Sequence, residues 1–161
     1  MDSLITLKQI LKTMVDAHTR LLDLAKGKRN MLVDGDIQGL QSQTHREALC
    51  VDEIQKLEQL RIKCVQGYME HKGVKGESFT LEDVIKVDPD ANTRDELTSM
   101  AIKLRTLIQE INQLNENNQK LIQTSLSYIQ YSIGMFARKE PAIGYGPNAK
   151  NRYSNMLDAK I

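Results

Sequence analysis

LTSMAIKLRTLIQEINQLNENNQKLIQTSLSYIQYSIGMF, residues 97–136, is the stretch that decides the fold. Apolar residues recur in it every three or four positions without a proline, which predicts one long helix from about Thr93 to about Lys139. Its expected stripe consists of Leu97, Met100, Leu104, Leu107, Ile111, Leu114, Asn118, Leu121, Ser125, Tyr128, Ser132 and Met135. Near the end, apolar residues surround the helix instead of lining one face. Such a helix must be buried on several sides, which in so small a chain favours a partner.

A first helix is expected at the start of the chain. Its apolar residues are spaced alternately by three and four, which is typical of a helical packing seam. The seam consists of Leu4, Leu7, Leu11, Met14, His18, Leu21, Ala25 and Leu32. This helix should end near Val33, because Asp34-Gly35-Asp36 is turn chemistry. Asp36 should then cap the next helix through its carboxylate.

A second helix is expected from Ile37 to about Glu70, with several polar residues in its seam. The seam consists of Ile37, Leu40, Thr44, Glu47, Val51, Ile54, Leu57, Arg61, Cys64 and Tyr68. Glu47 and Arg61 share a face without touching, so each should need water or a partner on another helix. The alternative is that this seam is only half covered.

The segment between the second and third long helices should hold one short helix. Two glycines in His71–Gly76 end the second helix, and Thr80-Leu81-Glu82-Asp83 resembles a capping box with Asp in place of Glu. We expect one or two helical turns there, closed by Asp88-Pro89-Asp90. After Pro141 the helical pattern stops, which predicts a flexible tail.

The predicted fold is therefore all-α, an elongated antiparallel bundle of three long helices with a short helical turn between the second and third. We expect a helical bundle domain over residues 1–140 and a flexible docking tail over residues 141–161. Cys50 and Cys64 lie fourteen positions apart in one helix, too far for an intrahelical disulfide, so both should be buried or half-buried thiols in a reducing cytoplasm.

Composition limits the classes of function. Lys and Arg number 22 against 21 Asp and Glu, and this balance provides no general attraction to nucleic acid or anionic membranes. The sequence shows no apolar run long enough to span a membrane and no stretch typical of a secretory signal. We therefore expect a cytoplasmic protein without direct membrane insertion.

The sequence also contains none of the common catalytic motifs. The three histidines each lack a Glu three residues upstream, and no Walker loop, nucleophile elbow or metal-spaced cysteine pair occurs. The sequence therefore predicts no enzyme, no metal and no cofactor. His18 is interpreted as a hydrogen-bonded interface histidine, and Asn115–Asn118 as a polar layer that sets helix register.

Three features of the chain together carry a family resemblance. They are the stretch NENNQKLIQTSLSY (residues 115–128) on a long helix, a break after that helix, and Tyr145-Gly146-Pro147-Asn148 beyond the break. In this order and at these distances the chain resembles the FlgN family of flagellar export chaperones. It departs from the family pattern at Ala149, where relatives often have Gly.

The resemblance implies a cytoplasmic chaperone that binds the C-terminal helices of hook-filament junction proteins, which are hook-associated proteins, before export. It implies that substrates contact the late part of the last long helix. The residues on that part are Leu121, Ile122, Ser125, Tyr128, Ile129, Ser132, Ile133 and Phe136. The tail tyrosine of the family, by position Tyr145 with its neighbours Gly146 and Asn148, is implied to dock the loaded chaperone on the cytoplasmic domain of the export gate.

The residues agree with such a role on physical grounds. Apolar anchors three and four positions apart suit the binding of a helix in a groove, small serines allow close approach, and Tyr128 and Tyr131 add contact area. Two alternatives compete, namely that this face closes the intramolecular bundle or that it forms a homodimer, as in a self-associating coiled-coil structural or adaptor protein.

Overall fold

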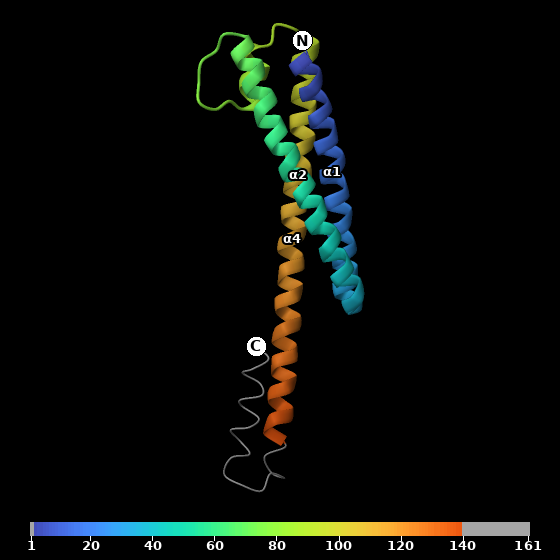
Figure 1. The fold of residues 1–161 in the computed structure, drawn as a ribbon. Helices are drawn as coiled ribbons and strands as arrows, with labels where there is room; N and C mark the ends of the chain where they lie inside the picture. Colours follow the sequence, from blue (N-terminus) through green and yellow to red (C-terminus); the bar gives the residue numbers. More distant parts are fainter. Residues whose placement is uncertain (1, 140–161) are drawn as a thin grey trace. The chain divides into compact units, whose positions relative to one another are not determined.

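The computed structural model describes residues 2–139, and this part of the chain contains four α-helices and no strand (Figure 1). They are α1 (Asp2–Asp34), α2 (Ile37–His71), α3 (Leu81–Val87) and α4 (Ala91–Lys139). The prediction of three long helices with a short one between the second and third is confirmed. The chain divides into two compact units, residues 1–118 and residues 119–161.

The hydrophobic core of the first unit combines all four helices. Buried residues one or two turns apart on α1, α2 and α4 meet the single buried valine of α3. The cluster consists of Leu7, Ile10, Leu11, Met14, Val65, Tyr68, Met69, Val84, Leu97 and Leu104. Since Leu7, Leu11, Met14, Leu97 and Leu104 belong to the predicted stripes, the apolar spacing of α1 and of the early part of α4 is confirmed.

A two-residue turn joins α1 to α2. Gly35 adopts a positive φ of 71°, and the backbone N–H of Asp36 donates to the carbonyl of Met31 at 3.0 Å. This is the glycine-terminated end that satisfies the last carbonyls of a helix. The Asp36 carboxylate then accepts a hydrogen bond from the backbone N–H of Gly39 at 2.9 Å, which confirms the predicted cap.

Side-chain hydrogen bonds to the main chain of α1 hold α2 antiparallel to it. Gln43 Nε2 donates to the carbonyl of Leu24 at 2.8 Å, and the Cys50 thiol donates to the carbonyl of Ala17 at 3.3 Å. Small residues make this close approach feasible, since a Cβ placed on Gly27 would lie 2.7 Å from Gln43 Nε2. The α1–α2 pair is therefore a tightly packed helical hairpin.

The predicted seam of α2 needs a correction. The buried positions in its first half are Gln43 and Cys50, whereas the predicted Thr44 and Val51 are exposed. The physical reason is that Gln43 and Cys50 contribute hydrogen bonds to α1, so the contact line lies one position earlier than the apolar residues indicate.

Glu47 and Arg61 differ in the partners that they find. Glu47 pairs with Lys28 of α1 at 3.3 Å, as expected for a residue that needs a partner on another helix. Arg61 instead pairs with Glu58 of its own helix, at 2.6 Å and 2.8 Å, so a partner three residues away supplies the neutralising charge. The hydrogen bond from Arg61 lowers the pKa of the Glu58 carboxyl.

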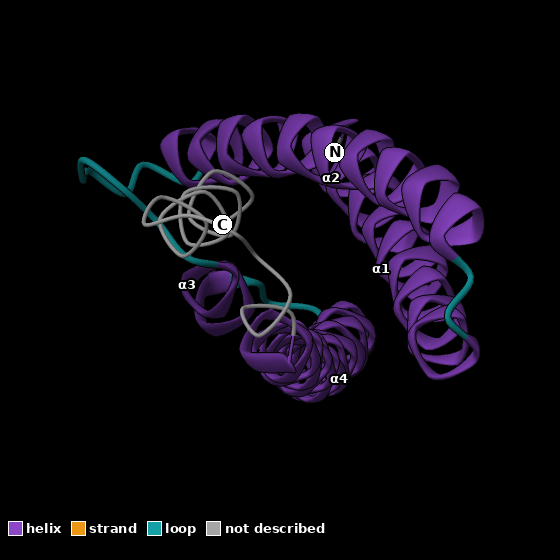
Figure 2. Cartoon of the chain, turned by 90° about the horizontal axis from the view of Figure 1, so that it is seen from below, coloured by secondary structure: helices purple, strands orange, loops and turns teal. Residues whose placement is uncertain are grey.

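The short helix α3 begins with the predicted capping box. The Thr80 hydroxyl accepts from the backbone N–H of Asp83, and the Asp83 carboxylate accepts from the backbone N–H of Thr80. Figure 2 shows α3 beside α4, and Arg105 of α4 pairs with Glu82 of α3. The Tyr68 hydroxyl donates to the buried Asp88 carboxylate at 2.6 Å, which ties α2 to the link between α3 and α4.

Candidate helix-binding surface

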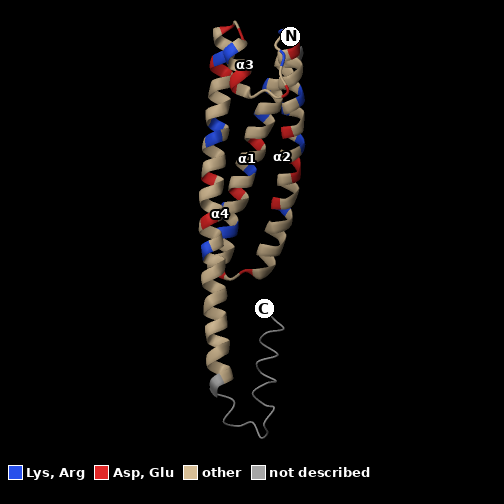
Figure 3. Ribbon diagram, turned by 90° about the vertical axis from the view of Figure 1, so that its left-hand side faces the viewer, with Lys and Arg blue, Asp and Glu red and all other residues tan. Residues whose placement is uncertain are grey.

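The part of α4 that lies in the second unit carries an uncharged run. Between Lys120 and Arg138 the sequence contains no Asp, Glu, Lys or Arg. Figure 3 accordingly shows neither blue nor red along this stretch of α4. The helix continues through it without interruption to Lys139. A helix surface without charge is suited to contacts with apolar side chains.

The eight residues implied by the resemblance all lie on this helix. Tyr128 is 70% exposed, Phe136 is 73% exposed, and Ile129 and Ile133 are also exposed. Leu121, Ile122 and Ser132 are half-buried, and Ser125 is exposed. At about 100° per residue the eight side chains span roughly 140° of the helix circumference. They therefore form one wide face with the two serines near its middle.

Three further exposed apolar residues outside the family-based set widen this face. They are Leu126, Tyr131 and Met135, exposed by 52%, 67% and 46%. The sequence had indicated two of them, Tyr131 as added contact area and Met135 in the stripe of the helix, and only Leu126 was missed. The spacing of four, three, four and three from Ile122 through Leu126 could have revealed it, because it repeats a heptad seam. With these residues the apolar surface covers roughly 220° of the circumference.

The enlarged surface consists of two seams with heptad spacing. The first, here named the isoleucine seam, consists of Ile122, Leu126, Ile129, Ile133 and Phe136. The second, named the tyrosine seam, consists of Leu121, Thr124, Tyr128, Tyr131 and Met135. Their centres lie roughly 140° apart around the helix.

The remaining side of this helix segment is polar or small. Gln123, Ser127 and Gln130 are exposed there, and Gly134 completes the strip. Together the polar strip and the two seams make the segment amphipathic, with an unusually wide apolar part. Tyr145, Gly146 and Asn148, the expected gate-docking residues, lie outside the described residues.

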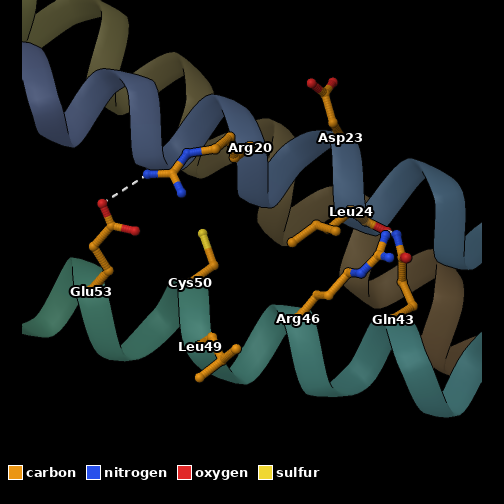
Figure 4. A pocket seen from close by; sticks show the side chains of 8 residues that line it. All are labelled: Arg20, Asp23, Leu24, Gln43, Arg46, Leu49, Cys50 and Glu53. Atoms are coloured by element: carbon orange, nitrogen blue, oxygen red, sulfur yellow. Dashed lines mark hydrogen bonds and ion pairs between the residues drawn. The ribbon is translucent and has the colours of Figure 1, made fainter.

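A separate pocket lies between α1 and α2, and most of the residues that line it are polar (Figure 4). Figure 4 shows Arg20 reaching across to Glu53, a pair joined at 2.8 Å, and this hydrogen bond lowers the pKa of the Glu53 carboxyl. Burial raises the pKa of the Cys50 thiol, which keeps it in the neutral form. With Gln43 and Cys50 both bonded to α1 carbonyls, the pocket serves the packing of the hairpin.

His18, predicted to be a hydrogen-bonded interface histidine, is buried. Its Nδ1 lies 2.7 Å from the carbonyl oxygen of Met14, one turn earlier. Among residues 2–139, no group of three or more His, Cys, Asp or Glu side chains could hold a metal ion. No helix in that same range combines the length and apolar character that a membrane span requires.

Comparison with known proteins adds one match. A family model described as FlgN protein matches residues 1–152. No curated protein and no solved structure matches the chain.

Proposed function

Because the chain belongs to the FlgN family, whose members are flagellar export chaperones, we propose that it binds the C-terminal helices of hook-associated junction proteins in the cytoplasm. In this proposal it prevents their premature assembly and delivers them to the flagellar type III export gate. Residues 1–140 act as the helical, substrate-binding domain and residues 141–161 as the docking tail.

The exposed, uncharged face of α4 is the observation that carries the proposal. Burying a large apolar side chain contributes about 1.5–3 kcal/mol. Tyr128, Ile129 and Phe136 are each more than half exposed, so this face offers substantial binding free energy to an amphipathic helix. The proposed substrate-binding residues are Leu121, Ile122, Ser125, Tyr128, Ile129, Ser132, Ile133 and Phe136.

Co-purification with the C-terminal fragment of a junction protein tests substrate binding. The double variant Ile129→Asp with Ile133→Asp should lose the fragment, because two carboxylates would be desolvated in the contact. The matched control is Gln123→Asp with Gln130→Asp, which adds the same charges to the exposed polar strip of the same helix. Both variants should keep the helical circular dichroism spectrum. Retention of the fragment by the first variant would remove the isoleucines from the site.

A second experiment tests the tail, for which we propose Tyr145, Gly146 and Asn148 as the gate-docking residues. Truncation after Glu140 should leave substrate binding intact and abolish binding of the loaded chaperone to the cytoplasmic domain of the export gate. Tyr145→Ala should reproduce the loss, whereas Tyr153→Ala, which removes another tail tyrosine, should not. A truncated chain that still binds the gate domain would contradict this assignment.

The heptad spacing of both seams favours a second candidate function, a self-associating coiled-coil adaptor. In that case identical chains would cover the apolar face of α4. Light scattering over a range of protein concentrations, with and without a junction-protein C-terminal peptide, separates the two functions. A chaperone should form a defined complex with the peptide, whereas the adaptor should grow in mass with its own concentration and ignore the peptide.

A further inference from the structure

The apolar surface of the late part of α4 is too wide for one partner helix. A helix contact typically uses an apolar stripe of about 100°. The isoleucine seam and the tyrosine seam have centres roughly 140° apart. A single helix packed on Ile129 would therefore leave Tyr131 exposed to water. Tyr131 is 67% exposed in the chain alone, so its apolar surface would stay uncovered.

A second copy of the chain would not complete this surface either. A dimer formed through one seam would leave the other seam exposed on both copies. Further copies that pair one seam with the other seam of the next copy would bury both seams only where the rotation between copies closes a ring. Such a ring would leave no apolar surface for a client, against the proposed chaperone function.

A client that supplies two helical segments does close the assembly. One segment covers the isoleucine seam and the other covers the tyrosine seam, and no apolar seam remains exposed. Ser125 and Ser132 lie on the line between the two seams, where small side chains let both segments approach the α4 backbone. The absence of charge between Lys120 and Arg138 requires the facing sides of both segments to be apolar and uncharged.

We propose that one client chain binds α4 through two amphipathic helical segments, one on each seam, in a complex of one chaperone and one client. This inference rests on the proposed chaperone function and adds to it the form of the client. One segment contacts Leu126 in the isoleucine seam and the other contacts Tyr131 in the tyrosine seam. The family resemblance alone includes neither residue.

Site-specific photo-crosslinking in the full chain tests this arrangement. A benzoylphenylalanine is placed at Leu126 in the isoleucine seam, at Tyr131 in the tyrosine seam, or at Ser127 in the polar strip as a control. The probe is the C-terminal fragment of a junction protein, and the crosslinked peptides are identified by mass spectrometry. Leu126 and Tyr131 should crosslink to two different segments of the fragment, and Ser127 should give no product.

Three outcomes would overturn the inference. Crosslinks from both seams to one client segment, or from one seam only, would show a single bound helix while leaving the chaperone function intact. Crosslinks to a second copy of the chain would assign one seam to self-association. Failure of the helical wild-type chain to form any complex with the fragment would instead overturn the proposed function itself.

Binding measurements provide an independent readout. Leu126→Gln and Tyr131→Gln should each weaken fragment binding by about tenfold or more, since each removes an anchor from a separate seam. Ser127→Gln should bind as the wild type does. The titration should end at one fragment per chain, and an unchanged affinity for either seam variant would exclude that seam from the interface.

Discussion

Asn118 on α4 donates a hydrogen bond from its Nδ2 to the carbonyl oxygen of Ala25 on α1, at 3.1 Å. The Asn118 side chain is only 2% exposed, and among the described residues its Oδ1 has no hydrogen-bond partner. A buried amide with one unsatisfied oxygen fixes how two helices align but lowers stability. Of the residues predicted as a polar layer, Asn115–Asn118, Asn118 is the buried one.

Asn118→Leu should raise the free energy of unfolding by about 1 kcal/mol. The substitution removes one hydrogen bond but also removes a buried acceptor without a partner, whose cost is about 1–3 kcal/mol. Urea denaturation followed by circular dichroism measures the change. Asn115→Leu, at an exposed position three residues earlier, should change stability little. A lower midpoint for Asn118→Leu would show that the amide stabilises the fold.

Tyr68→Phe should lower the free energy of unfolding by about 1.5–3 kcal/mol, because the buried phenol donates to a carboxylate. The matched control is Tyr131→Phe, which removes the same hydroxyl from a side chain that is 67% exposed. Denaturation in urea at neutral pH compares the two. Equal midpoints for both variants would contradict a stabilising role of the Tyr68–Asp88 bond.

Alkaline pH should remove the same contribution without a mutation. Burial raises the pKa of the Tyr68 phenol above its ordinary value of about 10, and Asp88 adds to the increase. A raised folded-state pKa gives stability that is complete below the unfolded pKa and is lost as the pH rises through the folded one. The stability difference between the wild type and Tyr68→Phe should therefore be constant from about pH 7 to 9 and shrink above about pH 10. A constant difference throughout would refute the linkage.

Two helical glycines should respond differently to alanine. A Cβ at Gly67 meets nothing within 4 Å, so Gly67→Ala should stabilise the chain by about 1 kcal/mol through helix propensity. At Gly27 the same Cβ lies 2.7 Å from Gln43 Nε2, so alanine must displace the side chain that donates to Leu24. Gly27→Ala should therefore give no stabilisation. Thermal unfolding of both variants decides, and equal gains would show that the α1–α2 contact is adaptable.

Local signals in the sequence predicted the ends of the helices well. Gly35, Asp36 and Thr80 act on backbone groups within a few residues, so their roles were correctly predicted from the sequence. The buried line of α2 was predicted one position late. Gln43 and Cys50 are buried because they reach carbonyls of α1, a contact that the spacing of apolar residues does not encode.

The sequence indicated only part of the candidate surface, because apolar spacing does not encode contacts with other elements. The resemblance and the helical spacing indicated one face of α4 together with Tyr131, and the exposed fraction of Leu126 extended it further around the helix. Apolar periodicity shows which side chains share a face, but it does not show whether other parts of the same chain cover that face.

The turn at Gly35 and Asp36 has a consequence for synthesis. Because it pairs α1 with α2 through contacts about 33 residues apart, such as that between Ala17 and Cys50, a hairpin can form while the nascent chain is still leaving the ribosome. Leu97 and Leu104, which complete the core, are translated much later. During that interval Leu7 and Leu11 lack the α4 residues of their core cluster, so we expect slow translation between residues 72 and 104 to favour aggregation.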